Sequence, residues 1–253
     1  MDQFYLTLPS DSSLKYYPEN TTACFKTKLS DRIDLDGEYE VGLAQLNYPH
    51  SWFNFNNKNE EYYILCTPDN KSEPVILCIF SSGQFSNAKV MARVLSDSMS
   101  IEGIEGAGFI YDTWKRKMAL AITNNKATFN MSTDLEEFLG YGGTRSYRRG
   151  NHIADHTFDL NSNLRLLYLY SDIVSYSLVG DTKAPLVRVC YVQGEFGDMI
   201  QTTFTHPHYV PLSRTNFETI EININNELGR PMPFEFGKSV VTLHFRRKNK
   251  LLL

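Results

Sequence analysis

Short runs in which apolar and polar residues alternate constrain the fold of this chain more than any other feature. In residues 220–225 isoleucine alternates with Glu or Asn, and in residues 241–246 Val, Leu and Phe alternate with Thr, His and Arg. A period of two places alternate side chains on opposite faces of a strand, so each run predicts a β-strand with one buried face. Similar runs predict strands at 4–8, 25–29, 39–46, 62–66, 75–80, 109–122, 164–170 and 187–191.

The connections between these runs favour antiparallel pairing. Asp36-Gly37 separates the runs at 25–29 and 39–46, and an Asp-Gly pair between alternating runs predicts a tight hairpin. Residues 68–71, Pro-Asp-Asn-Lys, predict a turn between the runs at 62–66 and 75–80. The first third of the chain is therefore predicted to be an antiparallel meander. Many short strands without a βαβ repeat predict an all-β fold, a single jelly roll built as an antiparallel β-sandwich.

The middle of the chain has a different pattern, with two predicted helices. Ser86 is expected to cap a short amphipathic helix, because apolar residues recur at 88, 91, 94 and 95. Thr133 and Glu136 have the spacing of a capping box, and Gly140 is placed to end the second helix. We expect residues 1–253 to form one jelly-roll domain, in which 81–151 is a small α/β insertion or elaborated connection.

Charge and hydropathy exclude some classes of protein. The 253-residue chain has a formal net charge of -4, so no overall positive charge indicates nucleic-acid binding. The longest apolar run, 75–80, is far shorter than the roughly 20 residues of a membrane-spanning helix. The start, MDQFYLTLPSDSS, lacks the basic and continuously apolar regions of a signal peptide, so we expect synthesis in the cytosol.

No pattern in the sequence predicts a catalytic site, a metal site or a cofactor. The phosphate-binding, dinucleotide-binding, zinc-protease and serine-hydrolase motifs are absent. His206 and His208 lack a nearby third ligand for a metal. The four cysteines are far apart and are expected to be buried free thiols. Cys190 with His156 is the arrangement left open for an enzyme, a cysteine hydrolase.

Two kinds of candidate interaction surface follow from the sequence. Trp52, Phe53 and Phe55 form either a subunit interface or ordinary core. Two basic segments are candidate contact surfaces for phosphate, with salt bridges or a solvated tail as the alternative. Their residues are Arg145, Arg148 and Arg149 in a Gly-rich loop, and Arg246, Arg247, Lys248 and Lys250 near the C-terminal end.

Several ordered phrases occupy roughly the first and last fifths of the chain, and a further phrase, FLGYGG, lies in the middle. The phrases at the ends are MDQFYLTLPSDSS, YYPENTTACFKTKL, LDGEYEVGLAQLNYPHSW, YVPL and FETIEININNELGRPMPFEFGKSVVTLHFRR. In this order they resemble the minor capsid (penton) protein of Polinton/Maverick elements and their adintovirus relatives. The resemblance implies a single jelly-roll protein that forms homopentamers at the five-fold vertices of an icosahedral shell, beside a double jelly-roll major capsid protein. It implies a place in the virion and no catalytic residue or cofactor.

Three functions therefore stay open. The first is a structural subunit of a capsid. In one form of this hypothesis, the basic C-terminal segment contacts packaged DNA. The second is a β-sandwich binding module that recognises a receptor, glycan or protein through its loops. In one form of this second hypothesis, the gene is domesticated from a Polinton/Maverick element. The third is the cysteine enzyme. A stable pentamer in solution favours the first, whereas a monomer with saturable ligand affinity favours the second.

Overall fold

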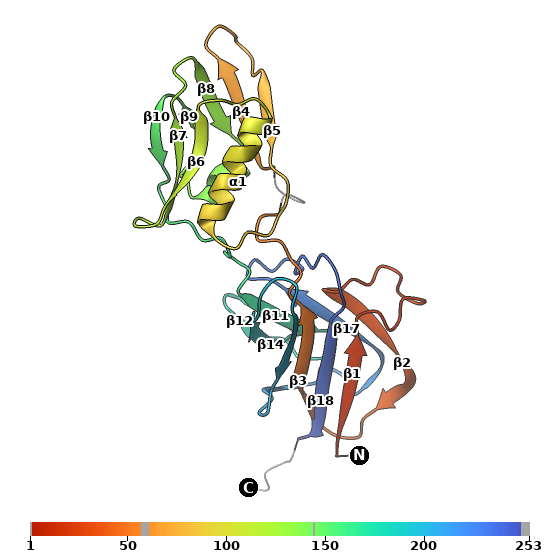
Figure 1. The fold of residues 1–253 in the computed structure, drawn as a ribbon. Helices are drawn as coiled ribbons and strands as arrows, with labels where there is room; N and C mark the ends of the chain where they lie inside the picture. The colour runs from red at the N-terminus through yellow and green to blue at the C-terminus, as the bar shows by residue number, and fades with distance from the viewer. Residues whose placement is uncertain (1, 57–60, 144, 249–253) are drawn as a thin grey trace. The chain divides into compact units, whose positions relative to one another are not determined.

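The computed structural model describes residues 2–56, 61–143 and 145–248. The chain divides into two compact units (Figure 1). Unit 1 comprises the chain up to Trp52 and from Ser162 onward, and unit 2 comprises Phe53–Asn161. Each unit has a hydrophobic core of its own, and no residue belongs to both cores.

Unit 1 is a sandwich of two antiparallel sheets. Its strands are β1 (Gln3–Pro9), β2 (Cys24–Asp34), β3 (Tyr39–Pro49), β11 (Leu166–Ser171), β14 (Leu186–Tyr191), β15 (Met199–Thr203), β16 (Tyr209–Pro211), β17 (Asn216–Asn225) and β18 (Val240–Arg247). One sheet has the order β1-β18-β3-β15, with β16 also paired to β3, and the other has the order β14-β11-β17-β2. A separate hairpin joins β12 (Ser177–Val179) to β13 (Thr182–Ala184).

In unit 1 the first strand of the sequence pairs with the last, and strands progressively further from the two chain ends pair with each other. β1 pairs with β18, β2 with β17, β3 with β15 and β16, and β11 with β14. A long antiparallel ribbon that is wrapped into two facing sheets in this way is a jelly roll. The alternating runs bury one face each, because Ile220, Ile222 and Ile224 are fully buried in the core. The prediction of an all-β jelly roll is confirmed.

The predicted hairpin at Asp36-Gly37 is wrong, and so is the part of the predicted meander that depends on it. The turn predicted at residues 68–71 is confirmed, because it joins the antiparallel strands Tyr63–Pro68 and Ile76–Ile79. Gly37 does have a positive φ of 98°, but β2 and β3 lie in different sheets and pair with β17 and β18. The chain therefore crosses from one sheet to the other at this turn. The local Asp-Gly signal fixes a change of direction, whereas the partners of both strands are set by apolar faces far away in the sequence.

Unit 2 is a small α/β structure inserted between β3 and β11 of the jelly roll. Its elements are β4 (Tyr63–Pro68), β5 (Ile76–Ile79), α1 (Ala88–Ile101), β6 (Ala107–Asp112), β7 (Lys117–Ile122), β8 (Ala127–Met131), α2 (Thr133–Leu139), β9 (Ser146–Tyr147) and β10 (Gly150–Ile153). The strands form two antiparallel sheets, β5-β4-β8-β9 and β10-β7-β6. Figure 1 shows α1 beside these strands, and Met91, Leu95 and Met99 bury its apolar face in the unit 2 core.

The predicted insertion, residues 81–151, lies inside unit 2, which begins earlier at Phe53. The difference arises because β4 pairs with β8, so β4 and β5 belong to the second core and not to the jelly roll. An alternating run shows that a strand has one buried face, but it does not show which core receives that face.

Both predicted helices are present, but their caps differ from the prediction. Asn87, one residue after Ser86, caps α1, since its side-chain oxygen accepts from the backbone N–H of Lys89 and of Val90. The predicted capping box of α2 is wrong, because Ser132 is the N-cap residue and the Glu136 side chain is buried. Gly140 ends α2 with a left-handed φ of 88°, as predicted.

Candidate assembly surfaces

The three aromatic residues predicted as either interface or core occupy both units. Trp52 is 2% exposed and packs in unit 1, stacked on His50 with the ring centres 4.2 Å apart. Phe55 is fully buried in unit 2, where it stacks on Tyr62 at 4.4 Å. Phe53 is half-buried. Trp52 and Phe55 therefore pack in the cores of their own units, and a role of the three residues at a subunit interface stays a prediction.

The first basic segment surrounds the strand β9 in unit 2. Arg145 forms a salt bridge with Asp155, with 2.9 Å between guanidinium and carboxylate, while Arg148 and Arg149 are exposed. The backbone N–H of Gly142 and then the Arg145 charge hold the pKa of Asp155 below its ordinary value. Arg145 is thus neutralised within the chain, and phosphate contact by the other two stays a prediction.

The second basic segment belongs to unit 1 and is partly paired. The Arg246 guanidinium lies 3.5 Å from the centre of the Tyr209 ring and 2.5 Å from a Glu40 oxygen. Lys248 approaches Glu38 at 3.9 Å, and Arg247 is exposed. Lys250 lies outside the described residues. Among the described residues of this segment, Arg247 is therefore the cation without an ion pair, and contact of the segment with phosphate stays a prediction.

An aromatic row, which no pattern in the sequence predicts, crosses the outer face of the jelly-roll sheet next to Arg246. Strand register aligns Tyr5 with His244, His244 with Gly42, and Gly42 with Tyr209. Tyr5 stacks on His244 at 4.3 Å, and the Tyr209 hydroxyl shares a 2.6 Å hydrogen bond with His244 Nδ1. Gly42 is required because a Cβ there would lie 2.9 Å from the His208 carbonyl oxygen. Burial, and then the charge of Arg246, lower the pKa of His244.

Unit 1 exposes large apolar side chains on the edge strand of one sheet and on a separate hairpin. Tyr191 on the edge strand β14 is 75% exposed, and Leu178 on the β12–β13 hairpin is 77% exposed. Tyr176, at the start of that hairpin, is also exposed. Large apolar side chains that remain in water at a sheet edge are typical of surfaces that a neighbouring subunit covers.

Unit 2 has a comparable apolar edge. Val75, Leu77 and Ile79 are exposed along β5, an edge strand, whereas Cys78 between them is fully buried. The outward row continues onto β4, because Leu77 is aligned with Leu65 and Ile79 with Tyr63. This apolar patch covers the outer face of the sheet, away from the unit 2 core.

Cys190, the candidate nucleophile, is buried in the unit 1 core. Burial raises the pKa of the Cys190 thiol to about 11, which disfavours the reactive thiolate at neutral pH. In the described part of the chain, no group of three or more His, Cys, Asp or Glu residues could hold a metal ion. Within the same residues, no helix is long and apolar enough to cross a membrane.

The buried thiols predict a loss of stability in alkali. Burial raises the pKa of Cys190 in unit 1 and of Cys78 in unit 2 from 9.0 to about 11. Below pH 9 both thiols are protonated in the folded and unfolded states, whereas between pH 9 and 11 only the unfolded state ionises. We therefore expect the free energy of unfolding to fall over that interval, by on the order of 2 kcal/mol for each thiol. Urea unfolding at a series of pH values measures how steeply the free energy of unfolding falls with pH. Cys190→Val should make this fall less steep for unit 1. If the fall is the same in Cys190→Val as in wild type, the raised pKa of Cys190 is contradicted.

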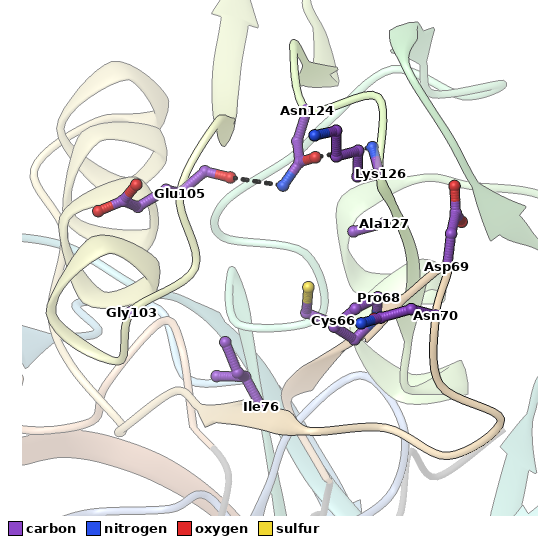
Figure 2. Close-up of a pocket in the computed structure, with 10 residues that line it drawn as sticks. All are labelled: Cys66, Pro68, Asp69, Asn70, Ile76, Gly103, Glu105, Asn124, Lys126 and Ala127. Carbon is purple, nitrogen blue, oxygen red and sulfur yellow. Dashed lines mark hydrogen bonds between the residues drawn. The ribbon is translucent and has the colours of Figure 1, made fainter.

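Figure 2 shows a hollow of about 560 Å³ among three loops of unit 2. The side chain of Asn124 links two of these loops: its Nδ2 donates to the carbonyl of Glu105 at 3.4 Å, and its Oδ1 accepts from the N–H of Lys126 at 2.9 Å. Asp69 adds a carboxylate and Cys66 part of the apolar lining. A mixed lining of this kind can form hydrogen bonds with a small polar ligand.

Comparison with known proteins gives matches among solved structures alone. No family model matches this chain, and no curated protein matches its sequence. The crystal structure of the mavirus penton protein superposes with a TM-score of 0.50 at 12% identity, and the alignment covers 96% of this chain and 99% of that one. A chain from the cryo-EM structure of the Sputnik virophage gives a TM-score of 0.42 at 12% identity, with 98% of each chain covered. The predicted resemblance to a penton protein is thereby confirmed for the fold, over the full length of the chain.

Proposed function

We propose that this chain is a structural minor capsid protein, the penton at the vertices of an icosahedral shell in a Polinton/Maverick-type virus or transposon. The observation that carries the proposal is the fold likeness to the mavirus penton protein, which spans both units. The ordered phrases at the two ends of the sequence support the same family. In this role the protein works by geometry, without a catalytic residue, metal or cofactor, and resides in the virion after synthesis in the host cytosol.

The exposed apolar edges support assembly with copies of the same chain. A closed ring of five subunits uses head-to-tail contacts, so two different faces of each subunit must be complementary. We assign one of these faces to a surface of unit 1 that includes Tyr191 of β14 and Leu178 of the β12–β13 hairpin. Burial of these two side chains in a subunit contact would stabilise that contact. A neighbouring double jelly-roll major capsid protein is the second partner, and Arg247 with Lys248 is a local contact for packaged DNA.

The organisation of the chain fits one jelly-roll domain with an elaboration. Unit 2 interrupts the ribbon between β3 and β11, and every strand of the two sandwich sheets comes from unit 1. We therefore infer that unit 2 is an insertion into a single jelly-roll protein, and that it supplies surfaces that the jelly roll itself does not need for its fold.

Light scattering across a concentration series tests the assembly. We expect the purified chain to have the mass of five 29.1 kDa subunits. The double substitution Leu178→Asp, Tyr191→Asp should shift the protein to monomer, because it places two carboxylates in an apolar contact. Leu228→Asp is the matched control, since Leu228 is exposed on a turn elsewhere in unit 1. A wild-type monomer that also fails to join shells assembled with the major capsid protein would overturn the proposal.

A binding module is the second candidate, and the hollow in Figure 2 is the observation that favours it. Its loops carry exposed polar side chains, of which Asp69 and Lys126 differ in charge. In that case the chain would be a monomer with saturable affinity for a small polar ligand such as a saccharide. A glycan-array screen of wild type and of Asn124→Ala distinguishes the two functions, since Asn124→Ala would reduce ligand binding and leave the mass unchanged.

A further inference from the structure

The tip of the β6–β7 hairpin presents a single tryptophan to solvent. Trp114 is 93% exposed, more than any other large apolar side chain among the described residues. Trp52, the other tryptophan of the chain, is buried. A single exposed apolar side chain needs no functional explanation by itself, so the inference depends on how the tip is held and on what surrounds it.

The hairpin tip is held in one conformation by its own hydrogen bonds. The Asp112 side chain accepts from the backbone N–H of Trp114 at 2.9 Å and of Lys115 at 3.0 Å. Arg116 has a left-handed φ of 54°, and its carbonyl oxygen accepts from the N–H of Phe158 at 2.8 Å. A turn that is already ordered loses little conformational entropy when it docks on a partner.

The charge around Trp114 is positive. Lys115 and Arg116 are exposed, and neither forms a salt bridge within the part of the chain that the structure describes. Lys117 donates to the carbonyl of Asp155 at 2.6 Å, which adds a third cation at the base of the hairpin. Asp112 accepts from backbone N–H groups of the turn and offsets one of these charges, whereas Asp155 forms the salt bridge with Arg145. The tip therefore carries a net positive charge.

Apolar side chains are also exposed on the sheet that carries the tip. Ile110 on β6 is 54% exposed, and strand register aligns it with the buried Ala119 on β7 and then with Ile153 on β10, which is 37% exposed. The sheet therefore exposes apolar side chains besides Trp114, and its hairpin tip is basic.

We propose that this hairpin tip docks on an anionic lipid surface. Tryptophan prefers the boundary between water and hydrocarbon, where its ring is buried and its N–H remains hydrated. Lys and Arg beside it gain from the negative potential of an anionic leaflet. One ring with no second aromatic at the tip is a poor platform for stacked bases, which makes single-stranded nucleic acid the weaker fit. The inference goes beyond the proposed capsid function and rests on the hairpin alone.

Vesicle co-sedimentation of the full chain tests the inference. Wild type is expected to sediment with phosphatidylcholine vesicles that contain phosphatidylserine, less with phosphatidylcholine alone, and less at high salt. Trp114 emission should shift to the blue on binding, since Trp52 is already buried. Trp114→Ala should abolish the shift and weaken binding, and Lys115→Glu with Arg116→Glu should weaken it by about thirtyfold or more.

The turn that follows β1 supplies a matched control, because it also exposes an apolar residue beside a lysine and has no part in the proposed subunit contact. Leu14→Ala with Lys15→Glu should leave vesicle binding unchanged. Circular dichroism and light scattering on every variant separate a lost contact from lost folding or lost assembly. The inference is overturned if wild type does not bind anionic vesicles, if the tip variants bind as well as wild type, or if the tip binds single-stranded DNA and not vesicles.

Discussion

Replacement of Phe245 with alanine is expected to lower the free energy of unfolding of unit 1 by about 3–5 kcal/mol. The ring is fully buried, stacks on Phe4 of β1 at 4.7 Å, and lies 6.0 Å from Phe217 in the opposite sheet. Its loss would leave a cavity between the two sheets. The sheets cannot readily close this cavity, because β18 is hydrogen-bonded to β1 on one side and to β3 on the other. Urea unfolding followed by Trp52 fluorescence in a Trp114→Phe background reports on unit 1 alone.

Phe236→Ala is the matched control for that measurement. Phe236 belongs to the same unit and loses the same atoms, but it is 51% exposed and contacts Phe196 at the surface. We expect its replacement to cost no more than about 1 kcal/mol. Unit 2, whose core shares no residue with that of unit 1, should unfold as in wild type when followed by hydrogen exchange of the backbone amides that pair β4 with β8. Equal losses for Phe245→Ala and Phe236→Ala would contradict the assigned core.

The strands of the jelly roll could be predicted from the sequence because each buries one face. The runs at 220–225 and 241–246 became β17 and β18, with the isoleucines of β17 and Phe245 inside as the alternation indicates. Strand partners could not be predicted in the same way, since β1 pairs with β18 across nearly the whole chain. Asp36-Gly37 wrongly predicted a hairpin for this reason. A turn residue determines local backbone conformation, whereas the sheet that each strand joins is determined by contacts far apart in the sequence.

The surfaces were harder to predict than the core. Residues 75–80 are uniformly apolar in sequence, yet Leu77 and Ile79 face outward and Cys78 faces inward. The row from Tyr5 through His244 to Tyr209 exists only because of strand register, and its members are far apart in the chain. Arg145 forms a salt bridge with Asp155, the alternative that the sequence leaves open beside phosphate contact, and phosphate contact by this basic segment stays a prediction.

Glu136 is the residue whose role the sequence pattern misstated most, and its replacement should have the second large effect. The pattern assigned its carboxylate to a capping box at the start of a helix, but Glu136 is 1% exposed and Ser132 is the N-cap residue. One carboxylate oxygen accepts from the Tyr147 hydroxyl at 2.9 Å and from the Arg145 backbone N–H at 3.1 Å. Burial and this carboxylate raise the pKa of Tyr147. Glu136→Ala would leave both donors unpaired inside unit 2, so we expect a loss of about 2–5 kcal/mol in its unfolding free energy.

Glu137 offers the control for this prediction, because it is the next residue of the same helix and is exposed. Glu137→Ala removes the same atoms and the same charge, and should change stability by no more than about 0.5 kcal/mol. A double-mutant cycle with Tyr147→Phe isolates the hydrogen bond: if Glu136 and Tyr147 act together, the two losses should not be additive. Additive losses, or equal effects at 136 and 137, would mean that the buried carboxylate does not organise the loop that carries Arg145.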